Sequence, residues 1–108
     1  MERYSFGDIV IIGFPFTSME NAVMRPAMVL VDTGDEDIIV SKITSQKRDV
    51  DTDLDITNWQ KKGLLRKSYV RLSKIATLNR RDIKKKISTL EKSDIKKAKK
   101  IIKKMFGL

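Results

Sequence analysis

The sequence predicts a mainly β fold with some α content, a small and strongly curved barrel followed by one C-terminal amphipathic helix. Several short β-branched runs are separated by turns or brief helical signals, a pattern typical of small all-β barrels. A 3.6-residue apolar period occurs only near the end. The 108 residues are 41% apolar, which suits one core. We therefore expect a single domain over residues 1–108, with the barrel at about 5–90 and the helix at about 92–106.

Three strands are predicted in the first half of the chain. Residues Gly7–Phe16 (GDIVIIGFPF) form a β-branched run that ends in Gly and Pro, which indicates a first strand. The polar stretch Thr17–Met24 is expected to be a loop. Pro26–Thr33 and Ile38–Ser45 are the next two strands, and the short Gly34–Asp37 segment between them predicts a hairpin, because glycine can adopt positive φ in a tight turn.

The middle of the chain is more polar. Residues Gln46–Thr57 alternate charged and apolar side chains, which predicts an exposed connection leading into an edge strand. One helical turn should follow, capped by Thr57 or Asn58 and ended by Gly63.

The next strand is predicted over Ser68–Leu78, where apolar and polar side chains alternate. Val70 and Leu72 are expected to face inward, with Ile75 as a further inward candidate.

Two short elements and the long helix complete the prediction. Asn79–Lys86 is expected to be a short helix capped by Asn79, and Ile87–Leu90 a short strand. The final helix should be capped by Ser93 or the turn before it and should end at Gly107. Its apolar face follows the helical period through Ile95, Ala98, Ile101, Ile102, Met105 and Phe106.

Composition restricts the chemistry. The chain has no cysteine, which excludes disulfides and a thiol nucleophile, and no histidine, the commonest zinc ligand and neutral-pH base. We expect no metal and no cofactor. No segment has the length of a membrane span and the start does not resemble a signal peptide, so a cytoplasmic protein without a membrane partner is expected.

The net charge of +9 is concentrated at the end of the chain. Residues 1–79 carry 11 basic and 11 acidic residues, whereas residues 80–108 carry 12 basic and 3 acidic residues. Such a segment can attract phosphates or an acidic protein. The alternative is an ordinary solvated helix face.

Three polar residues interrupt apolar strands and are the candidates for chemistry. Arg25 opens the second strand before Pro26, Thr44 lies near the end of the third, and Arg71 lies inside YVRLSKI. If the second and third strands pair about their turn, Arg25 and Thr44 are near neighbours across the ladder. Taken singly, each also has a simpler explanation, because threonine favours strands and arginine favours surfaces.

Four blocks of sequence together resemble the MazF/PemK (Kid) family of toxin–antitoxin endoribonucleases. They are GDIVIIGFPFT, RPAMVLV, VSKITSQ and YVRLSKIATLNRRDIKKKISTL, in an order and spacing that cover nearly the whole chain. The resemblance implies an SH3-like, PemK/CcdB-type barrel, a homodimer, and sequence-selective cleavage of single-stranded RNA without a metal. The products would be a 2′,3′-cyclic phosphate and a 5′-hydroxyl.

The resemblance also implies roles for individual residues. Arg25 matches the arginine of the family's Arg-Pro pair and Thr44 its catalytic threonine. The other residues expected to contact RNA are Ser45, Gln46, Arg71, Ser73 and Asn21. Ser73 stands where one branch of the family has an aspartate, so Arg71 is expected to contact substrate, and the general base is left open.

Two functions of different classes follow. The first is a ribonuclease toxin inhibited by a cognate antitoxin that contributes an acidic segment. The second is a non-catalytic SH3-like module that binds nucleic acid or protein, an inactivated relative or a regulator. The first requires Arg25 beside Thr44, whereas the second requires only the basic surface.

Overall fold

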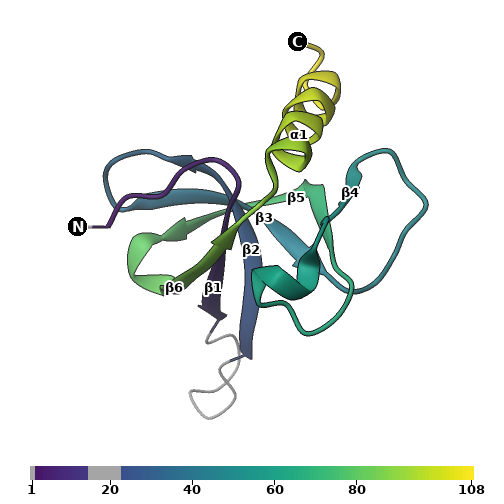
Figure 1. The fold of residues 1–108 in the computed structure, drawn as a ribbon. Coiled ribbons are helices and arrows are strands. Elements are labelled where there is room, and N and C mark those ends of the chain that lie inside the picture. Colours follow the sequence, from purple (N-terminus) through teal and green to yellow (C-terminus); the bar gives the residue numbers. More distant parts are fainter. Residues whose placement is uncertain (1, 15–22) are drawn as a thin grey trace.

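The computed structural model describes residues 2–14 and 23–108. Within these residues, six strands, two short 3₁₀ helices and one α-helix follow one another (Figure 1). In order they are β1 (Asp8–Phe14), β2 (Val23–Asp32), β3 (Asp37–Thr44), β4 (Asp53–Asp55), η2 (Trp59–Lys62), β5 (Tyr69–Asn79), η3 (Arg80–Asp82), β6 (Ile83–Thr89) and α1 (Lys92–Met105). No helix in the described part of the chain is both long and apolar enough to cross a membrane.

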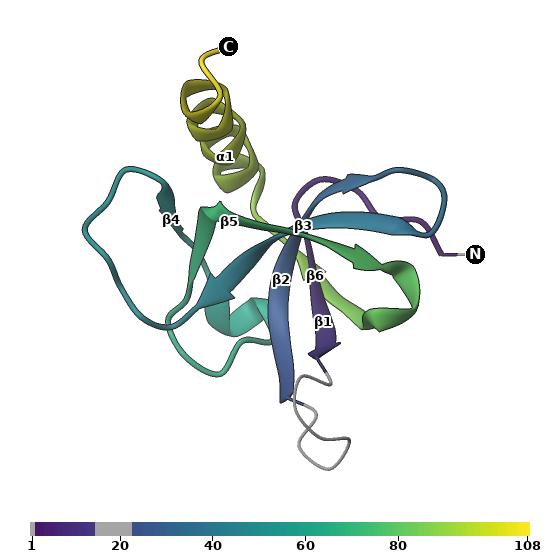
Figure 2. The same ribbon diagram turned by 180° about the vertical axis from the view of Figure 1, so that it is seen from behind.

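All six strands belong to one antiparallel sheet with the order β4-β5-β3-β2-β1-β6. The mainly β fold with a C-terminal helix is therefore confirmed. The closed barrel is wrong, because β4 and β6 are the two edges and do not pair in the described residues. β4 is a short edge strand of three residues. Figures 1 and 2 show the resulting open, strongly twisted sheet, with α1 standing on one side of it.

The predicted hairpin is present. β2 and β3 pair antiparallel, and Gly34 in the connecting turn has φ of 87°. The first strand, predicted over Gly7–Phe16, is found at Asp8–Phe14, and its last two predicted residues lie outside the described residues.

A bulge in β5 changes which side chains face inward. Ser41 pairs with Ile75, whereas the next residue, Lys42, pairs with Arg71, so β5 contains extra residues at this point. A bulge reverses the inward and outward alternation beyond it. Val70 and Leu72 are fully buried as predicted, but Ile75 is 40% exposed and its inward placement is wrong.

Two apolar clusters form on the two faces of the curved sheet. Along β2, Met28 belongs to one cluster and its neighbour Val29 to the other, as the alternation of a strand requires. α1 packs on the first cluster through buried Ala98 and through the partly buried side chains of Ile95, Ile101, Ile102 and Met105. Phe106, predicted on this apolar face, is instead 59% exposed at the end of the helix.

The segment after β5 is more extended than predicted. Asn79 accepts a hydrogen bond from the Arg81 N–H, which confirms its capping role, but the helix it caps has only three residues. Ile83 begins β6, because Ile83–Thr89 pairs with β1. The lysines assigned to a helix thus belong to an edge strand, where charged side chains discourage pairing with another chain.

The predicted cap is corrected for one flanking helical element and confirmed for the other. η2 ends at Gly63 with φ of 83°, as expected, but Asn58 is left-handed and its side chain does not cap the turn. The Thr57 hydroxyl and N–H instead donate to buried Asp94 near the start of α1, at 3.0 and 2.7 Å. For α1 the second of the two predicted alternatives is confirmed, because its N-cap residue is Glu91 in the turn before Ser93.

Candidate functional site

Arg25 and Thr44 occupy neighbouring strands at the open end of the β2–β3 hairpin. The last ladder pair of this hairpin joins Ala27 to Lys42. Two residues further along each antiparallel strand, a continuation of this register would set Arg25 opposite Thr44. The ladder ends before these residues in the described part of the chain, so their cross-strand pairing stays a prediction. What brings the two residues together is a cleft that both of them line.

A cleft of about 660 Å³ lies at this end of the sheet. It is bordered by the start of β2, the end of β3 and the segment from Gly63 to Ser68, with β1 and β6 completing the wall. Among the described lining residues, the charged ones are all basic and none is Asp or Glu. The cations are Arg25, Lys42, Arg66 and Lys85, and the neutral polar side chains are Thr44, Ser45, Gln46 and Ser68. Such a lining suits an anion.

The Thr44 hydroxyl is held in one orientation by the backbone. Its Oγ1 accepts a hydrogen bond from the Gln46 N–H at 3.1 Å, a side-chain-to-backbone bond to the residue two positions on. A hydroxyl has one proton to donate and two lone pairs to accept with. Thr44 can therefore receive this bond and still donate to a phosphate oxygen or accept from a sugar hydroxyl.

A second, more apolar cleft of about 420 Å³ adjoins the first. The two clefts share three residues, Arg25, Pro26 and Lys42. The second is otherwise lined by Ile12, Ala27, Val40, Lys74, Ile75 and Ala76. The exposed Arg25 guanidinium stands where both hollows meet, so it can act on a ligand that extends from one into the other.

The other predicted site residues divide into three groups. Ser45 and Gln46 line the main cleft beside Thr44. Arg71 and Ser73 line neither cleft; Ser73 is exposed and accepts a 3.5 Å hydrogen bond from the Thr52 hydroxyl. Asn21 lies outside the described residues.

Arg71 is instead part of a charged cluster beside the cleft, at the position of β5 that pairs with the cleft residue Lys42. Its Nε lies 3.9 Å from a carboxylate oxygen of Asp53 and is buried without a hydrogen-bond partner. Its Nη2 donates to the Gln46 carbonyl at 3.5 Å. Asp53 also accepts two hydrogen bonds from Arg48, at 2.8 and 3.1 Å, and this carboxylate raises the pKa of the Arg48 guanidinium. Arg71 therefore contacts the backbone of the segment that carries Ser45 and Gln46.

Several lining residues were missed from the sequence. Lys42 could have been found, because it precedes Thr44 by two residues and so shares its face of β3. Arg66 and Ser68 come from the segment after η2, and Lys85 comes from a strand predicted to be helical. Nothing in the local sequence of these three residues indicates that they approach β2.

The family follows from comparison with known proteins. Residues 5–106 match the model of the family described as PemK-like, MazF-like toxin of type II toxin-antitoxin system. The chain belongs to this family. The match covers nearly the whole chain and confirms the resemblance drawn from the four sequence blocks. No curated protein sequence matches the chain.

Solved structures of an endoribonuclease and of two MazF proteins have the same fold. An endoribonuclease in complex with its cognate antitoxin from a mycobacterial species has a TM-score of 0.79 at 14% identity, with 98% of this chain and 97% of that chain covered. Mycobacterium tuberculosis toxin MazF-mt6 has a TM-score of 0.76 at 22% identity, with 94% and 97% covered. MazF from Deinococcus radiodurans has a TM-score of 0.77 at 15% identity, with 100% of both chains covered.

Proposed function

We propose that this PemK-like, MazF-like toxin is a metal-independent, sequence-selective endoribonuclease that cleaves single-stranded RNA to 2′,3′-cyclic phosphate and 5′-hydroxyl ends. The observation that carries the proposal is the placement of Arg25 and Thr44 in one cleft whose described charged side chains are all basic. RNA brings both the phosphate that this cleft suits and an internal nucleophile, its 2′-hydroxyl.

The cleft's task is to stabilise charge and fix geometry. The 2′-oxygen attacks phosphorus as its proton leaves, the P–O5′ bond breaks, and the O5′ atom takes the bonding electron pair and a proton. Arg25 stabilises the charge that develops on the phosphorane oxygens, for which a planar, multidentate guanidinium is well suited. It is not assigned the role of general base, because the arginine pKa is above about 12. Thr44 orients the phosphate or the 2′-hydroxyl.

The remaining cations of the cleft position the chain of nucleotides. Lys42 and Lys85 border the cleft from β3 and β6, and Arg66 from the segment between η2 and β5. Ammonium groups act on phosphates as point charges with little base preference. Sequence selectivity is therefore assigned to the neutral polar side chains that line the cleft. Among these, the Gln46 amide can both donate hydrogen bonds to a base and accept them from it.

An acidic antitoxin segment is the proposed inhibitor. The family is defined by toxin–antitoxin pairs, and one of the similar structures holds an endoribonuclease with its cognate antitoxin. Carboxylates in an extended peptide would pair with the four cations of the cleft, an arrangement that favours fast association at low salt. Occupation of Arg25 by such a peptide would exclude the scissile phosphate.

We also propose that the active form is a homodimer. Support comes from Ile75, which the β5 bulge turns outward beside the apolar wall of the second cleft. Association of two chains at this wall would remove the Ile75 side chain from water, which favours binding. Sedimentation analysis of Ile75→Asp should give a monomer where the wild type sediments as a dimer; equal sedimentation of both proteins would reject this interface.

The nuclease proposal is tested by the chemistry of its products. Purified protein is incubated in excess EDTA with a long single-stranded RNA and with the same sequence carrying 2′-O-methyl groups throughout. We expect discrete cuts in the RNA alone, with ends that carry a cyclic phosphate and a 5′-hydroxyl. Cleavage of both substrates would reject the 2′-hydroxyl as nucleophile. Binding to both without cleavage would favour the non-catalytic module.

A further inference from the structure

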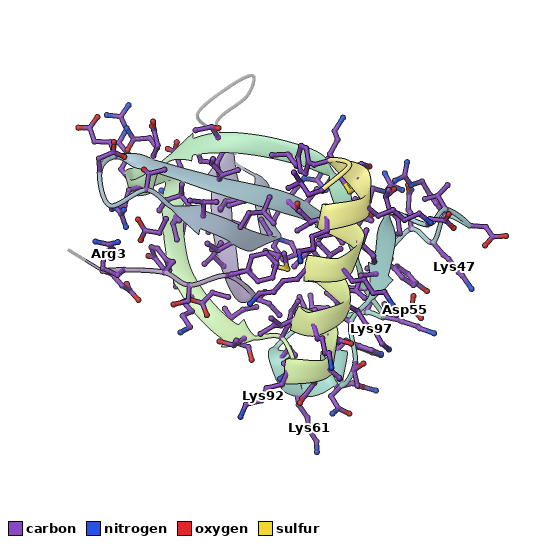
Figure 3. The ribbon with its side chains drawn as sticks, turned by 90° about the horizontal axis from the view of Figure 1, so that it is seen from above. Arg3, Lys47, Asp55, Lys61, Lys92 and Lys97 are labelled. Atoms are coloured by element: carbon purple, nitrogen blue, oxygen red, sulfur yellow. The ribbon has the colours of Figure 1, made fainter. Side chains whose placement is uncertain are left out.

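The strongest feature outside the cleft is the outer face of α1. From Lys92 to Lys104 every exposed residue is a lysine except Ser93. The lysines are Lys92, Lys96, Lys97, Lys99, Lys100, Lys103 and Lys104. In the described residues none of them forms an ion pair, although the Lys99 ammonium lies 5.5 Å from the centre of the Phe6 ring. Lys92 and Lys97 extend outward on two sides of the helix (Figure 3).

Helical geometry arranges these lysines as a regular surface. At about 100° per residue they cover an arc of roughly 160°, and the buried side chains occupy the rest of the circumference. Lys92, Lys96, Lys99 and Lys103 form one row, spaced four, three and four residues apart. With a rise of about 1.5 Å per residue, this row is about 16 Å long. We call all seven residues the α1 lysine face.

We propose that the α1 lysine face binds the phosphate backbone of RNA outside the segment held in the cleft. No residue of α1 lines either cleft, so this would be a second, separate contact. Lysine ammonium groups contact phosphates without reading bases, which suits a site that anchors any flanking sequence. The inference rests on the proposed function only for the choice of RNA as the polyanion.

The composition of the face favours a nucleic acid over the other polyanions. Protein interfaces are depleted of lysine at their centres and enriched in aromatic residues, whereas this face has no exposed apolar side chain between its first and last lysine. A membrane-bound amphipathic helix needs a free apolar face. The apolar face of α1 is already packed on the sheet through Ile95, Ala98 and Ile102.

The test compares two triple variants that lose the same charge. Lys96→Gln, Lys100→Gln and Lys103→Gln change adjacent positions of the α1 lysine face. The control carries Lys67→Gln, Arg81→Gln and Lys84→Gln, three exposed cations that form no ion pair within the described residues and line neither cleft. Both lower the net charge by three, from +9 to +6. Glutamine matches lysine in helix propensity, which protects the fold of α1.

Binding is measured with uncleavable 2′-O-methyl RNA pools of random sequence, about eight and about forty nucleotides long, the shorter one being comparable to a single small binding site. For the long pool, losing three phosphate contacts should lower the slope of log K against log salt by about 2. The ratio of wild-type affinity to α1-variant affinity for the long pool should then increase roughly 15- to 20-fold when the salt concentration is lowered from about 200 to about 50 mM. Its affinity for the short pool should equal that of the control variant.

Three outcomes would overturn the inference. Equal loss in the two triple variants would mean that only net charge matters. Wild-type affinity of the α1 variant for the long pool would show that the face does not bind RNA. Unchanged RNA binding with weakened binding of polyglutamate would assign the face to an acidic protein. The 2′-O-methyl pools cannot be cleaved, so this binding experiment does not depend on nuclease activity. It can be interpreted even if the EDTA assay rejects the nuclease proposal.

Discussion

Arg71 and Asp53 face one another from paired positions on β5 and β4, with 3.9 Å between Arg71 Nε and an Asp53 carboxylate oxygen. The Asp53 side chain is only 4% exposed and also binds Arg48. Arg71 in turn donates to the backbone of Gln46, which lines the cleft. The edge strand β4 thereby supports one wall of the site.

Asp53→Asn should lower both stability and activity. The change leaves two guanidinium groups without their shared carboxylate, and we expect unfolding in urea to become easier by about 1–3 kcal/mol. The Gln46 segment should also lose its support. We therefore expect the cleavage rate to fall even at temperatures where the variant is still folded, so that loss of stability does not explain the decrease. Asp55→Asn on the same strand is the matched control, because Asp55 is exposed and forms no ion pair with any described residue. Equal behaviour of the two variants would contradict the supporting role.

The attachment of α1 depends on Asp94. This buried carboxylate accepts hydrogen bonds from the Thr57 N–H and hydroxyl, so it ties the start of α1 to the segment before η2. Asp94→Ala should cost about 1–3 kcal/mol of unfolding free energy, because it leaves the Thr57 N–H and hydroxyl without their acceptor. Asp49→Ala, on the exposed connection, should be near neutral. Urea denaturation followed by circular dichroism measures both, and a neutral Asp94 variant would contradict this attachment.

Stability should fall in acid through Asp32. Hydrogen bonding from the Arg80 guanidinium holds the pKa of the Asp32 carboxyl well below its usual range, with further bonds from the N–H groups of Tyr4 and Gly34. A carboxyl whose pKa is lower folded than unfolded stabilises the protein above its unfolded pKa of about 3.9 and loses this effect as pH falls toward the folded value. The urea concentration at the unfolding midpoint should therefore decrease as the pH is lowered below about 4.

The Asp32→Asn variant distinguishes the contribution of the Asp32–Arg80 pair to acid sensitivity from the contributions of the other carboxylates. The variant should be less stable than wild type at neutral pH, and the difference should shrink as the pH falls below about 4, because the Asp32 carboxyl of the unfolded wild type then binds a proton while that of the folded protein does not. Asp35 also has a lowered pKa, through the Thr33 hydroxyl, and stays unchanged in the variant. A stability difference that is constant down to pH 2 would contradict the role of the Asp32–Arg80 pair.

Thr44 should act through its hydroxyl. Thr44→Ser keeps an oxygen that can accept from the Gln46 N–H, whereas Thr44→Val keeps the shape and removes the oxygen. We expect the serine variant to retain most activity and the valine variant to lose about 10²-fold or more in the rate of cleavage at saturating RNA, the size typical of one lost transition-state contact. Similar losses in both variants would indicate that Thr44 serves packing rather than substrate positioning.

The hairpin was predictable where local signals fix the geometry, because a glycine turn lies between two β-branched runs. The register at its open end was not, because a bulge between Val29 and Val31 shifts the pairing of β2 with β3 by one residue. Ile75 was misplaced because a bulge depends on how β5 fits against β3, which the residues of β5 alone do not encode. Asp53 was not foreseen beside Arg71, because the two meet only through the pairing of a three-residue edge strand.

The most direct measurement is the initial rate of RNA cleavage in EDTA by Arg25→Ala, with Arg81→Ala as the matched control. Both variants remove one exposed arginine that forms no ion pair in the described residues, but only Arg25 lines the cleft. With folding verified by circular dichroism, we expect Arg25→Ala to lose about 10²–10³-fold in rate and Arg81→Ala to stay close to wild type. Equal rates in the two variants would contradict the assignment of Arg25 to the reacting phosphate.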